Sequence, residues 1–145
     1  MGNRSETGVP VRMQVNMDIL DELKKILGEL LDIESGEITP ETYLVQDLGA
    51  ESIDLLELAV AINSRFKVAV KDDEIFLTRF RLYLSDAAQC EEDPISFAAK
   101  KYPFLNRDRI ADISARIDEG PQLKIKDLIS YITYRLEVFS SSQIY

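Results

Sequence analysis

The chain has 145 residues, of which 46% are hydrophobic, and carries a formal net charge of -9 at pH 7. This length suits one domain, or a small domain with a large insertion, with enough apolar residues for a core. The acidic balance argues against direct nucleic-acid binding, which normally requires a basic surface, and favours protein partners with basic surfaces.

The chain contains no histidine and one cysteine, Cys90. The commonest general base and metal ligand is therefore absent, and one thiol cannot form an intrachain disulfide or a thiolate metal cluster. We predict no catalytic residue, no metal site and no enzymatic activity. A lone thiol suits a reducing compartment, and no run is long and apolar enough to span a bilayer. We expect a cytoplasmic protein that does not span a membrane.

The predicted elements begin with a polar segment at residues 1–16, which we expect to be mobile. From Met17 onward, apolar residues recur at intervals of three and four, which predicts an amphipathic helix. Ser35 and Gly36 mark its end. A loop follows over residues 36–51, and its scattered apolar residues are expected to hold it against the core.

A second helix is predicted over residues 52–66, where the aliphatic residues form a broad stripe. Leu56 and Val60 widen this stripe, so we expect the helix to be packed on more than one side. Residues 67–71 are predicted as a loop.

The next helix is predicted to start at Asp72 and to continue until Pro94 breaks the pattern. A short helix over residues 94–102 follows, with proline at its start. Asn106 is expected to cap a further helix that ends at Gly120.

The last predicted helix covers about residues 126–138 and is followed by a frayed tail at residues 140–145. The sum is an all-α bundle. We expect residues 17–139 to form a single domain.

The stretch at residues 47–58 reads DLGAESIDLLEL and places Ser52 at the start of the second helix. Gly49 permits a turn that other residues resist. A serine at a helix N-terminus is exposed, and the helix dipole there stabilises the negative charge of a phosphate. The alternative is that Ser52 is a plain N-cap, for which serine is among the preferred residues.

This stretch resembles the prosthetic-group site of acyl carrier proteins, whose common form reads D-L-G-x-D-S-L-x-x-x-E. Here Glu51 and Ile53 replace the usual Asp and Leu on either side of the serine. The resemblance implies that a phosphopantetheinyl transferase attaches 4'-phosphopantetheine from coenzyme A to Ser52. The thiol of that arm would carry acyl chains as thioesters.

The resemblance also implies a four-helix bundle and covers about residues 17–76 and 123–136. Residues 77–122 form an insertion between the third and fourth family helices, and they enlarge the bundle by about two to three helices. Residues 18–76 contain 15 acidic and 5 basic residues, whereas residues 77–123 contain 8 and 7. The family-like part therefore holds the net charge, and the insertion is apolar enough that we expect it to join the core.

Five residues around the serine are predicted to dock partner proteins. They are Asp47, Glu51, Ile53, Asp54 and Glu57. In the family such acids meet basic surfaces of the transferase and of synthases, acyl-transferring enzymes or lipid-modifying enzymes, which favours fast, oriented encounters. The chain is expected to be a monomer.

We predict a non-catalytic acyl carrier for fatty-acid, lipid or polyketide-type biosynthesis, in a pathway to which the insertion dedicates it. Two alternatives remain open. One is an aminoacyl or peptidyl carrier, and the other is a protein-interaction module that kept the fold without the modification.

Overall fold

The computed structural model describes the backbone of residues 11–144 and the side chains of residues 17–137. Its helices confirm the predicted all-α class. They are α2 (Val11–Leu31), η1 (Ser35–Glu37), α3 (Ser52–Phe66), α4 (Asp72–Ile75), α5 (Phe80–Gln89), α6 (Pro94–Lys101), α7 (Arg107–Ala115), η2 (Ile117–Glu119) and α8 (Ile125–Ile144). Within the described residues, extended pairing is limited to an isolated antiparallel bridge between Tyr43 and Lys124.

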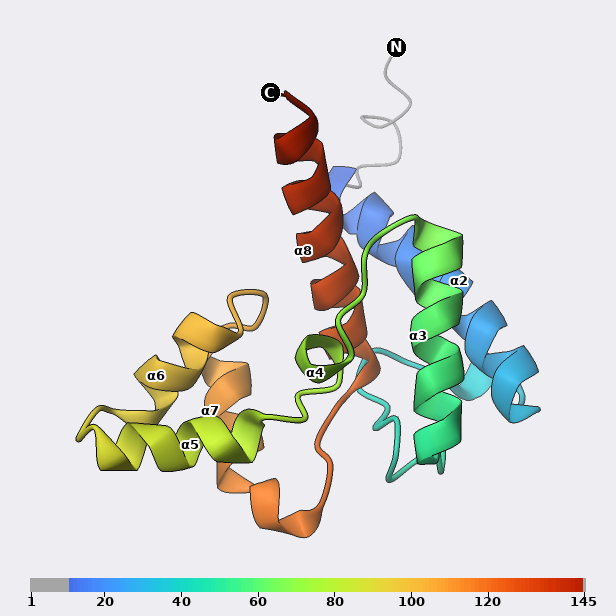
Figure 1. Cartoon of the computed structure of the whole chain (residues 1–145). Helices are drawn as coiled ribbons and strands as arrows, with labels where there is room; N and C mark the ends of the chain where they lie inside the picture. Colours follow the sequence, from blue (N-terminus) through green and yellow to red (C-terminus); the bar gives the residue numbers. More distant parts are fainter. Residues whose placement is uncertain (1–10, 145) are drawn as a thin grey trace.

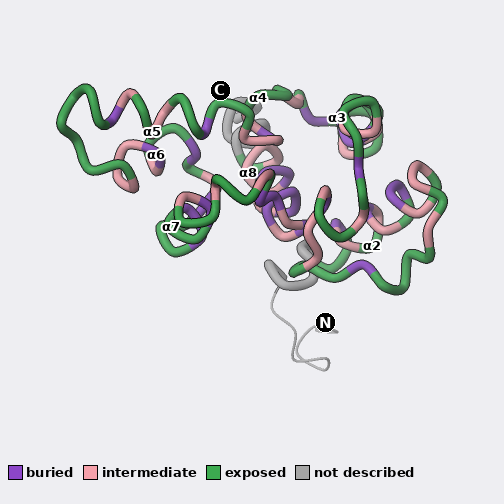
Figure 2. The backbone as a smooth tube through the Cα atoms, turned by 90° about the horizontal axis from the view of Figure 1, so that it is seen from below, coloured by how far each residue is buried: buried purple, intermediate pink, exposed green. Residues whose placement is uncertain are grey.

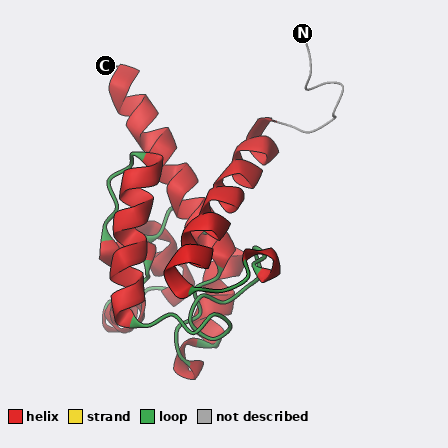
Figure 3. Ribbon diagram, turned by 90° about the vertical axis from the view of Figure 1, so that its right-hand side faces the viewer, coloured by secondary structure: helices red, strands yellow, loops and turns green. Residues whose placement is uncertain are grey.

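Figure 1 shows α8 between two groups of helices. On one side α2 packs against α3 and α8, and α4 packs against α8. On the other side α5 packs against α6, and α6 against α7. Towards the chain ends α2 and α8 diverge from one another (Figure 3). No helix in the described part of the chain is apolar over a length that would cross a membrane.

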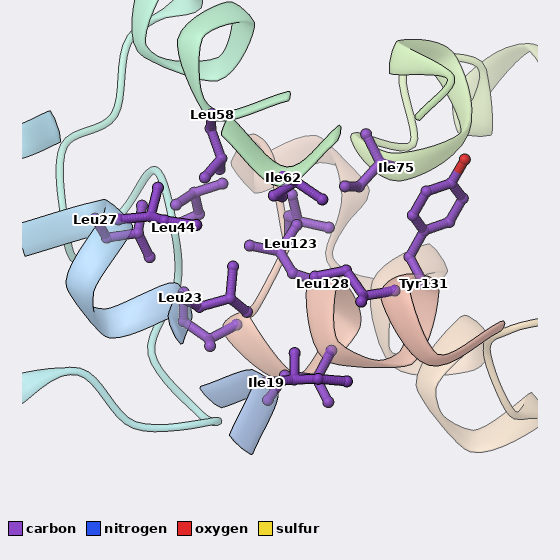
Figure 4. Packing of buried hydrophobic residues seen from close by; sticks show 14 of the residues in the cluster. Ile19, Leu23, Leu27, Leu44, Leu58, Ile62, Ile75, Leu123, Leu128 and Tyr131 are labelled. Carbon is purple, nitrogen blue, oxygen red and sulfur yellow. The ribbon is translucent and has the colours of Figure 1, made fainter. Parts of the chain in front are cut away.

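The bundle core is formed where α2, α3, α4 and α8 face one another, as Figure 4 shows. It contains Leu23 and Leu27 from α2, Ile62 from α3 and Leu128 from α8, each at most 1% exposed. The three- and four-residue spacing of apolar residues within each helix directs these side chains to one face. Ile38 and Leu44 of the loop are also buried there, as the sequence predicted.

The insertion forms a core of its own, and the expectation that it joins the bundle core is wrong. Its buried residues are Phe80, Ala98, Tyr102, Leu105, Ile110 and Ile113. In Figure 2, helices α5 to α7 lie on the far side of α8 from α2 and α3. The two cores are separate because the buried residues of the insertion come from α5, α6, α7 and the loop between α6 and α7, whereas the bundle core is built from α2, α3, α4 and α8.

The single helix predicted to run from Asp72 to Pro94 is broken into α4 and α5. Leu77 adopts a left-handed conformation with φ of 56° in the connection. The apolar spacing looked continuous, but Ile75 is buried in the bundle core and Phe80 in the insertion core. The chain must therefore turn between them, and an uninterrupted helix could not serve both.

Other helix boundaries differ from the predictions by less. Helix α2 already begins at Val11, and α8 continues to Ile144 through the serines that were predicted to fray. Serine lowers helix propensity only slightly, and no Gly or Pro stops this helix. Residues 1–10 and 145 lie outside the described backbone. The short α6 and the Asn106 cap are confirmed, since the Asn106 side chain accepts a hydrogen bond from the Arg109 N–H.

Two contacts join the insertion to α8. The Phe104 ring stands edge-on to Tyr131 of the bundle core at 4.9 Å and to Tyr102 of the insertion core at 6.0 Å. The Arg109 guanidinium binds the Asp127 carboxylate of α8, with Nε at 2.9 Å from Oδ1 and Nη2 at 2.8 Å from Oδ2. Both charged groups are almost completely buried, so this pair ties α7 to α8 in a site that water hardly reaches.

Candidate functional site

Ser52 is the first residue of α3, and its side chain is exposed. The N-cap is Glu51, whose N–H donates to Asp54 Oδ2 at 2.8 Å. The Ser52 hydroxyl has no hydrogen-bond partner among the described residues. The interpretation of Ser52 as a plain N-cap is therefore wrong, because Glu51 occupies that position.

The turn before Ser52 is held by the backbone. Gly49 has φ of 72°, the left-handed region that favours glycine, and its N–H donates to the Val45 carbonyl at 2.9 Å. The Asp47 carboxylate accepts the Tyr43 N–H at 2.9 Å and so closes the same turn. Leu48 packs against the bundle core. Ser52 therefore follows a shaped turn and not a slack loop.

The same loop is paired with the segment that leads into α8. The Leu44 N–H donates to the Leu123 carbonyl at 3.0 Å, and the Ile125 N–H donates to the Thr42 carbonyl at 3.0 Å. Both bonds lie within the family-like part of the chain, and each joins two residues that are far apart in sequence. They hold the loop against the segment that leads into α8.

Charged side chains support this pairing. Glu41 accepts hydrogen bonds from Lys124 at 2.8 Å and Lys126 at 3.1 Å. These bonds, with Lys124 the larger contributor, lower the pKa of Glu41 below its usual value. The carboxylate therefore stays ionised at neutral pH, and its ion pairs hold the loop to the two lysines on the solvent-exposed side.

The insertion also touches the loop directly. Arg116 Nη1 donates to the Tyr43 hydroxyl at 3.2 Å, and Gln46 Nε2 donates to the Pro121 carbonyl at 3.1 Å. The loop that precedes Ser52 is thus bounded by the bundle on one side and by the insertion on the other.

The predicted docking residues divide into two groups. Asp47 and Asp54 each accept a backbone N–H, so both carboxylates have a structural part in the turn and the helix start. Glu51 and Glu57 are exposed, and Ile53 is 59% exposed although it is aliphatic. The residues lie around Ser52, as the sequence predicted, but Glu51 also forms a capping box with Asp54, so only Ile53 and Glu57 present mainly free side chains.

Two further exposed residues on α3 were assigned wrongly from the sequence. Leu56 is 54% exposed and Val60 is 70% exposed, so the helix is not packed on more than one side. With Ile53 they form an apolar strip at positions i, i+3 and i+7, next to the buried stripe of Leu58 and Ile62. The spacing could have separated the two stripes, but aliphatic content alone could not show which one faces solvent.

Comparison with known families and proteins bears on this site. Residues 21–79 match a family model described as "Phosphopantetheine attachment site". The match covers α3 and ends directly before α5, so it leaves out the helices of the insertion. The covalent prosthetic group of this chain is 4'-phosphopantetheine.

Several relatives are carrier proteins. The chain is 32% identical over 85 residues to the acyl carrier protein of Solidesulfovibrio magneticus, a stretch that spans 59% of this chain and 96% of the relative. It is 36% identical over 58 residues to the acyl carrier protein of Wolinella succinogenes, which spans 40% of this chain and 76% of the relative. For the acyl carrier protein of Helicobacter pylori strain J99, the identity is 31% over 58 residues, 40% of this chain and 74% of the relative. The chain belongs to the acyl carrier protein family.

Proposed function

We propose that Ser52 is the attachment residue and that the chain carries acyl intermediates as thioesters on the phosphopantetheine arm. The observation that carries this proposal is the state of the Ser52 hydroxyl, which is exposed at the start of α3 while Glu51 and Asp54 cap the helix. The first N–H groups of a helix and its dipole favour a phosphate at this position. The residues around Ser52 therefore fit a phosphodiester.

Attachment requires coenzyme A and a transferase. The Ser52 oxygen bonds to the phosphorus that bears the pantetheine arm, and the phosphoanhydride bond of coenzyme A breaks. The nucleotide half leaves, and the serine proton passes to a base on the transferase. Nothing in this step needs an acid or base from the carrier itself, which suits a site without histidine.

The test is an intact mass after incubation with coenzyme A and several phosphopantetheinyl transferases. We expect a gain of one phosphopantetheine in the wild type and no gain in Ser52→Ala. Ser64→Ala is the matched control, because Ser64 is an exposed serine near the other end of the same helix. If no transferase modifies the wild type, the alternative of an unmodified interaction module would replace this proposal.

Partner enzymes dock, in this proposal, on the face of α3 that contains Glu51, Ile53, Leu56, Glu57 and Val60. Exposed ion pairs add little affinity each, typically under ~1 kcal/mol, but they speed and orient the encounter. The apolar strip adds area that both partners remove from water. Such a surface suits a shuttle that must bind each enzyme and then release it.

Charge reversal tests this surface. Glu57→Lys should lower kcat/KM of the transferase by roughly three- to tenfold, because the two proteins associate more slowly. The difference in kcat/KM from the wild type should shrink at high salt, which screens the charges. The control is Glu29→Lys, an equal charge change at an exposed position of α2. Equal losses in both variants would mean that net charge matters and the α3 face does not.

The pathway is proposed to be a dedicated branch of lipid or polyketide-type biosynthesis in the cytoplasm. It is supported by the insertion, which contacts the loop before Ser52 and lies outside the family match. Capture of the acyl thioester from the source cell and mass analysis of the released chain would identify the cargo. An amino acid or peptide on the arm would contradict this assignment.

A further inference from the structure

A cleft of about 230 Å³ lies between the bundle and the insertion, and its walls are mainly apolar. Val45 and Leu55 line the bundle side. Phe80, Ile113 and Ile117 line the opposite side and come from α5, α7 and η2. We call it the insertion cleft, because without residues 77–122 one of its two walls would not exist.

The insertion cleft lies beside the attachment residue. Leu55 is three residues after Ser52 on α3, so the two side chains emerge from neighbouring positions one turn apart. Val45 lies in the turn before Ser52, where its carbonyl accepts the Gly49 N–H at 2.9 Å. Both bundle-side residues therefore flank the point at which an arm would leave the protein.

The cleft is open because the two cores do not merge. Leu77, in a left-handed conformation, lies in the connection between α4 of the bundle and α5 of the insertion. Its side chain lies on the cleft wall and packs against both cores. One hydrogen bond, from Gln46 Nε2 to the Pro121 carbonyl, holds the loop beside the cleft against the insertion. An apolar hollow that water fills is unfavourable, so an apolar ligand would stabilise it.

We propose that the insertion cleft binds the acyl chain of the carrier's own thioester, so that the insertion, and not the bundle interior, shelters the cargo. This inference rests on the proposed attachment at Ser52. No charged side chain lines the cleft, which suits a hydrocarbon and not a charged or peptide cargo. A water molecule occupies about 30 Å³ in the liquid. If a methylene group takes the same volume, the cleft holds on the order of eight methylene groups.

The experiment compares carriers loaded with an acetyl or an octanoyl group from the corresponding acyl-coenzyme A. Intact mass first confirms loading, which tests attachment by itself. Contacts of the acyl group are then measured as nuclear Overhauser effects between the isotope-labelled acyl chain and methyl groups of the protein. We expect octanoyl contacts with Ile113 and Ile117 and none with Ile62 of the bundle core.

Shelter is measured by cleavage of the thioester with hydroxylamine. The octanoyl thioester should react roughly tenfold more slowly than the acetyl thioester, the ratio expected if sheltered chains outnumber exposed ones about ten to one. Each rate is divided by that of the same thioester on free pantetheine, which removes intrinsic reactivity.

Filling the cleft should abolish this difference. Ile117→Trp narrows it from the insertion side, and Val45→Trp narrows it from the bundle side, so failure of one variant to fold leaves the other. The matched control is Leu82→Trp, an equally large replacement at a residue of α5 that is 49% exposed and does not line the cleft. It should keep the tenfold difference.

The outcomes separate the two proposals. No mass gain would overturn attachment and this inference together. Loading followed by octanoyl contacts with Ile62, or by equal cleavage of the two thioesters in the wild type, would overturn only the insertion cleft. Loss of shelter in the Ile117 or Val45 variant, with shelter kept in the Leu82 variant, supports it.

Discussion

The bundle core is built almost entirely from aliphatic side chains, whereas the insertion core is built around aromatic rings. Among the described residues, Tyr131 is the one aromatic member of the buried cluster in the bundle. In the insertion, the Tyr102 ring stacks on Phe80 at 5.5 Å and meets Tyr83 edge-on at 5.7 Å. A few large rings bury much area, which suits a small core with short helices.

The bundle and the insertion also differ in how they are held in place. The bundle core joins four helices directly, while the insertion is attached to α8 through Phe104 and the Arg109–Asp127 pair and to the loop before Ser52 through Arg116 and Pro121. A unit attached at few points can open without the rest of the molecule. The insertion is therefore a partly independent unit placed beside an ordinary carrier.

The largest effect is expected for the buried ion pair. Asp127→Ala leaves the Arg109 guanidinium buried without its carboxylate and also removes the acceptor of the Lys124 N–H at 2.9 Å. We expect unfolding free energy to fall by about 3–5 kcal/mol, as for other buried pairs that lose one partner. Chemical denaturation followed by circular dichroism measures it.

The control for this variant is Asp118→Ala, which removes the exposed partner of Arg81. An exposed pair is worth between ~0 and 1 kcal/mol. If Asp127→Ala and Asp118→Ala behaved alike, the buried pair would not be what holds the insertion to α8.

A matched pair of core truncations tests whether the two cores open separately. Ile110→Ala in the insertion and Ile62→Ala in the bundle each remove the same atoms from a fully buried site. Each should lower stability by about 2–5 kcal/mol. Amide hydrogen exchange should quicken in α5 to α7 for the first and in α2, α3 and α8 for the second. Equal quickening throughout both variants would show a single cooperative unit.

The smallest effects are expected when each of two buried tyrosines loses its hydroxyl. The Tyr131 hydroxyl accepts the Lys71 N–H at 3.2 Å and donates to Glu74 at 2.9 Å. Tyr131→Phe should therefore cost about 1 kcal/mol. The buried Tyr102 hydroxyl has no partner among the described residues, so Tyr102→Phe should leave stability unchanged or raise it slightly. Thermal melts compare them, and losses of the same sign would contradict this contrast.

The stability at alkaline pH gives a second test of the buried Tyr131 hydroxyl. Burial, as the main cause, raises the pKa of Tyr131 to about 12, from a usual value near 10. Because the folded state prefers the neutral phenol, stability is complete below about pH 10 and falls as the pH rises towards 12. Tyr131→Phe should lose less stability across this window than the wild type. Equal losses would show that other groups dominate.

Much of the fold follows from local patterns in the sequence. The spacing of apolar residues predicted α3 over its whole length, and the Asp-Pro and Asn signals predicted α6 and the start of α7. The stretch at residues 47–58 also singled out Ser52, through its resemblance to the prosthetic-group site of acyl carrier proteins. These features depend on residues a few positions apart, which is what helix geometry couples.

Other features depend on contacts between residues that are far apart in the chain. Ile75 and Phe80 have helical spacing, yet they are buried in different cores, and only packing decides this. Leu56 and Val60 are as apolar as their buried neighbours on α3, and only the position of α2 and α8 shows that they face solvent. Arg109 and Asp127 look like surface charges in the sequence, and they meet only when α7 packs on α8.

The sequence by itself therefore determined most of the helices and the residue at the start of α3 on which the prosthetic group is expected. Only the tertiary structure decided that the insertion has its own core and that an apolar cleft lies between this core and the Ser52 helix. The physical reason is that helical periodicity assigns apolar residues to a face but does not say which core, if any, that face meets.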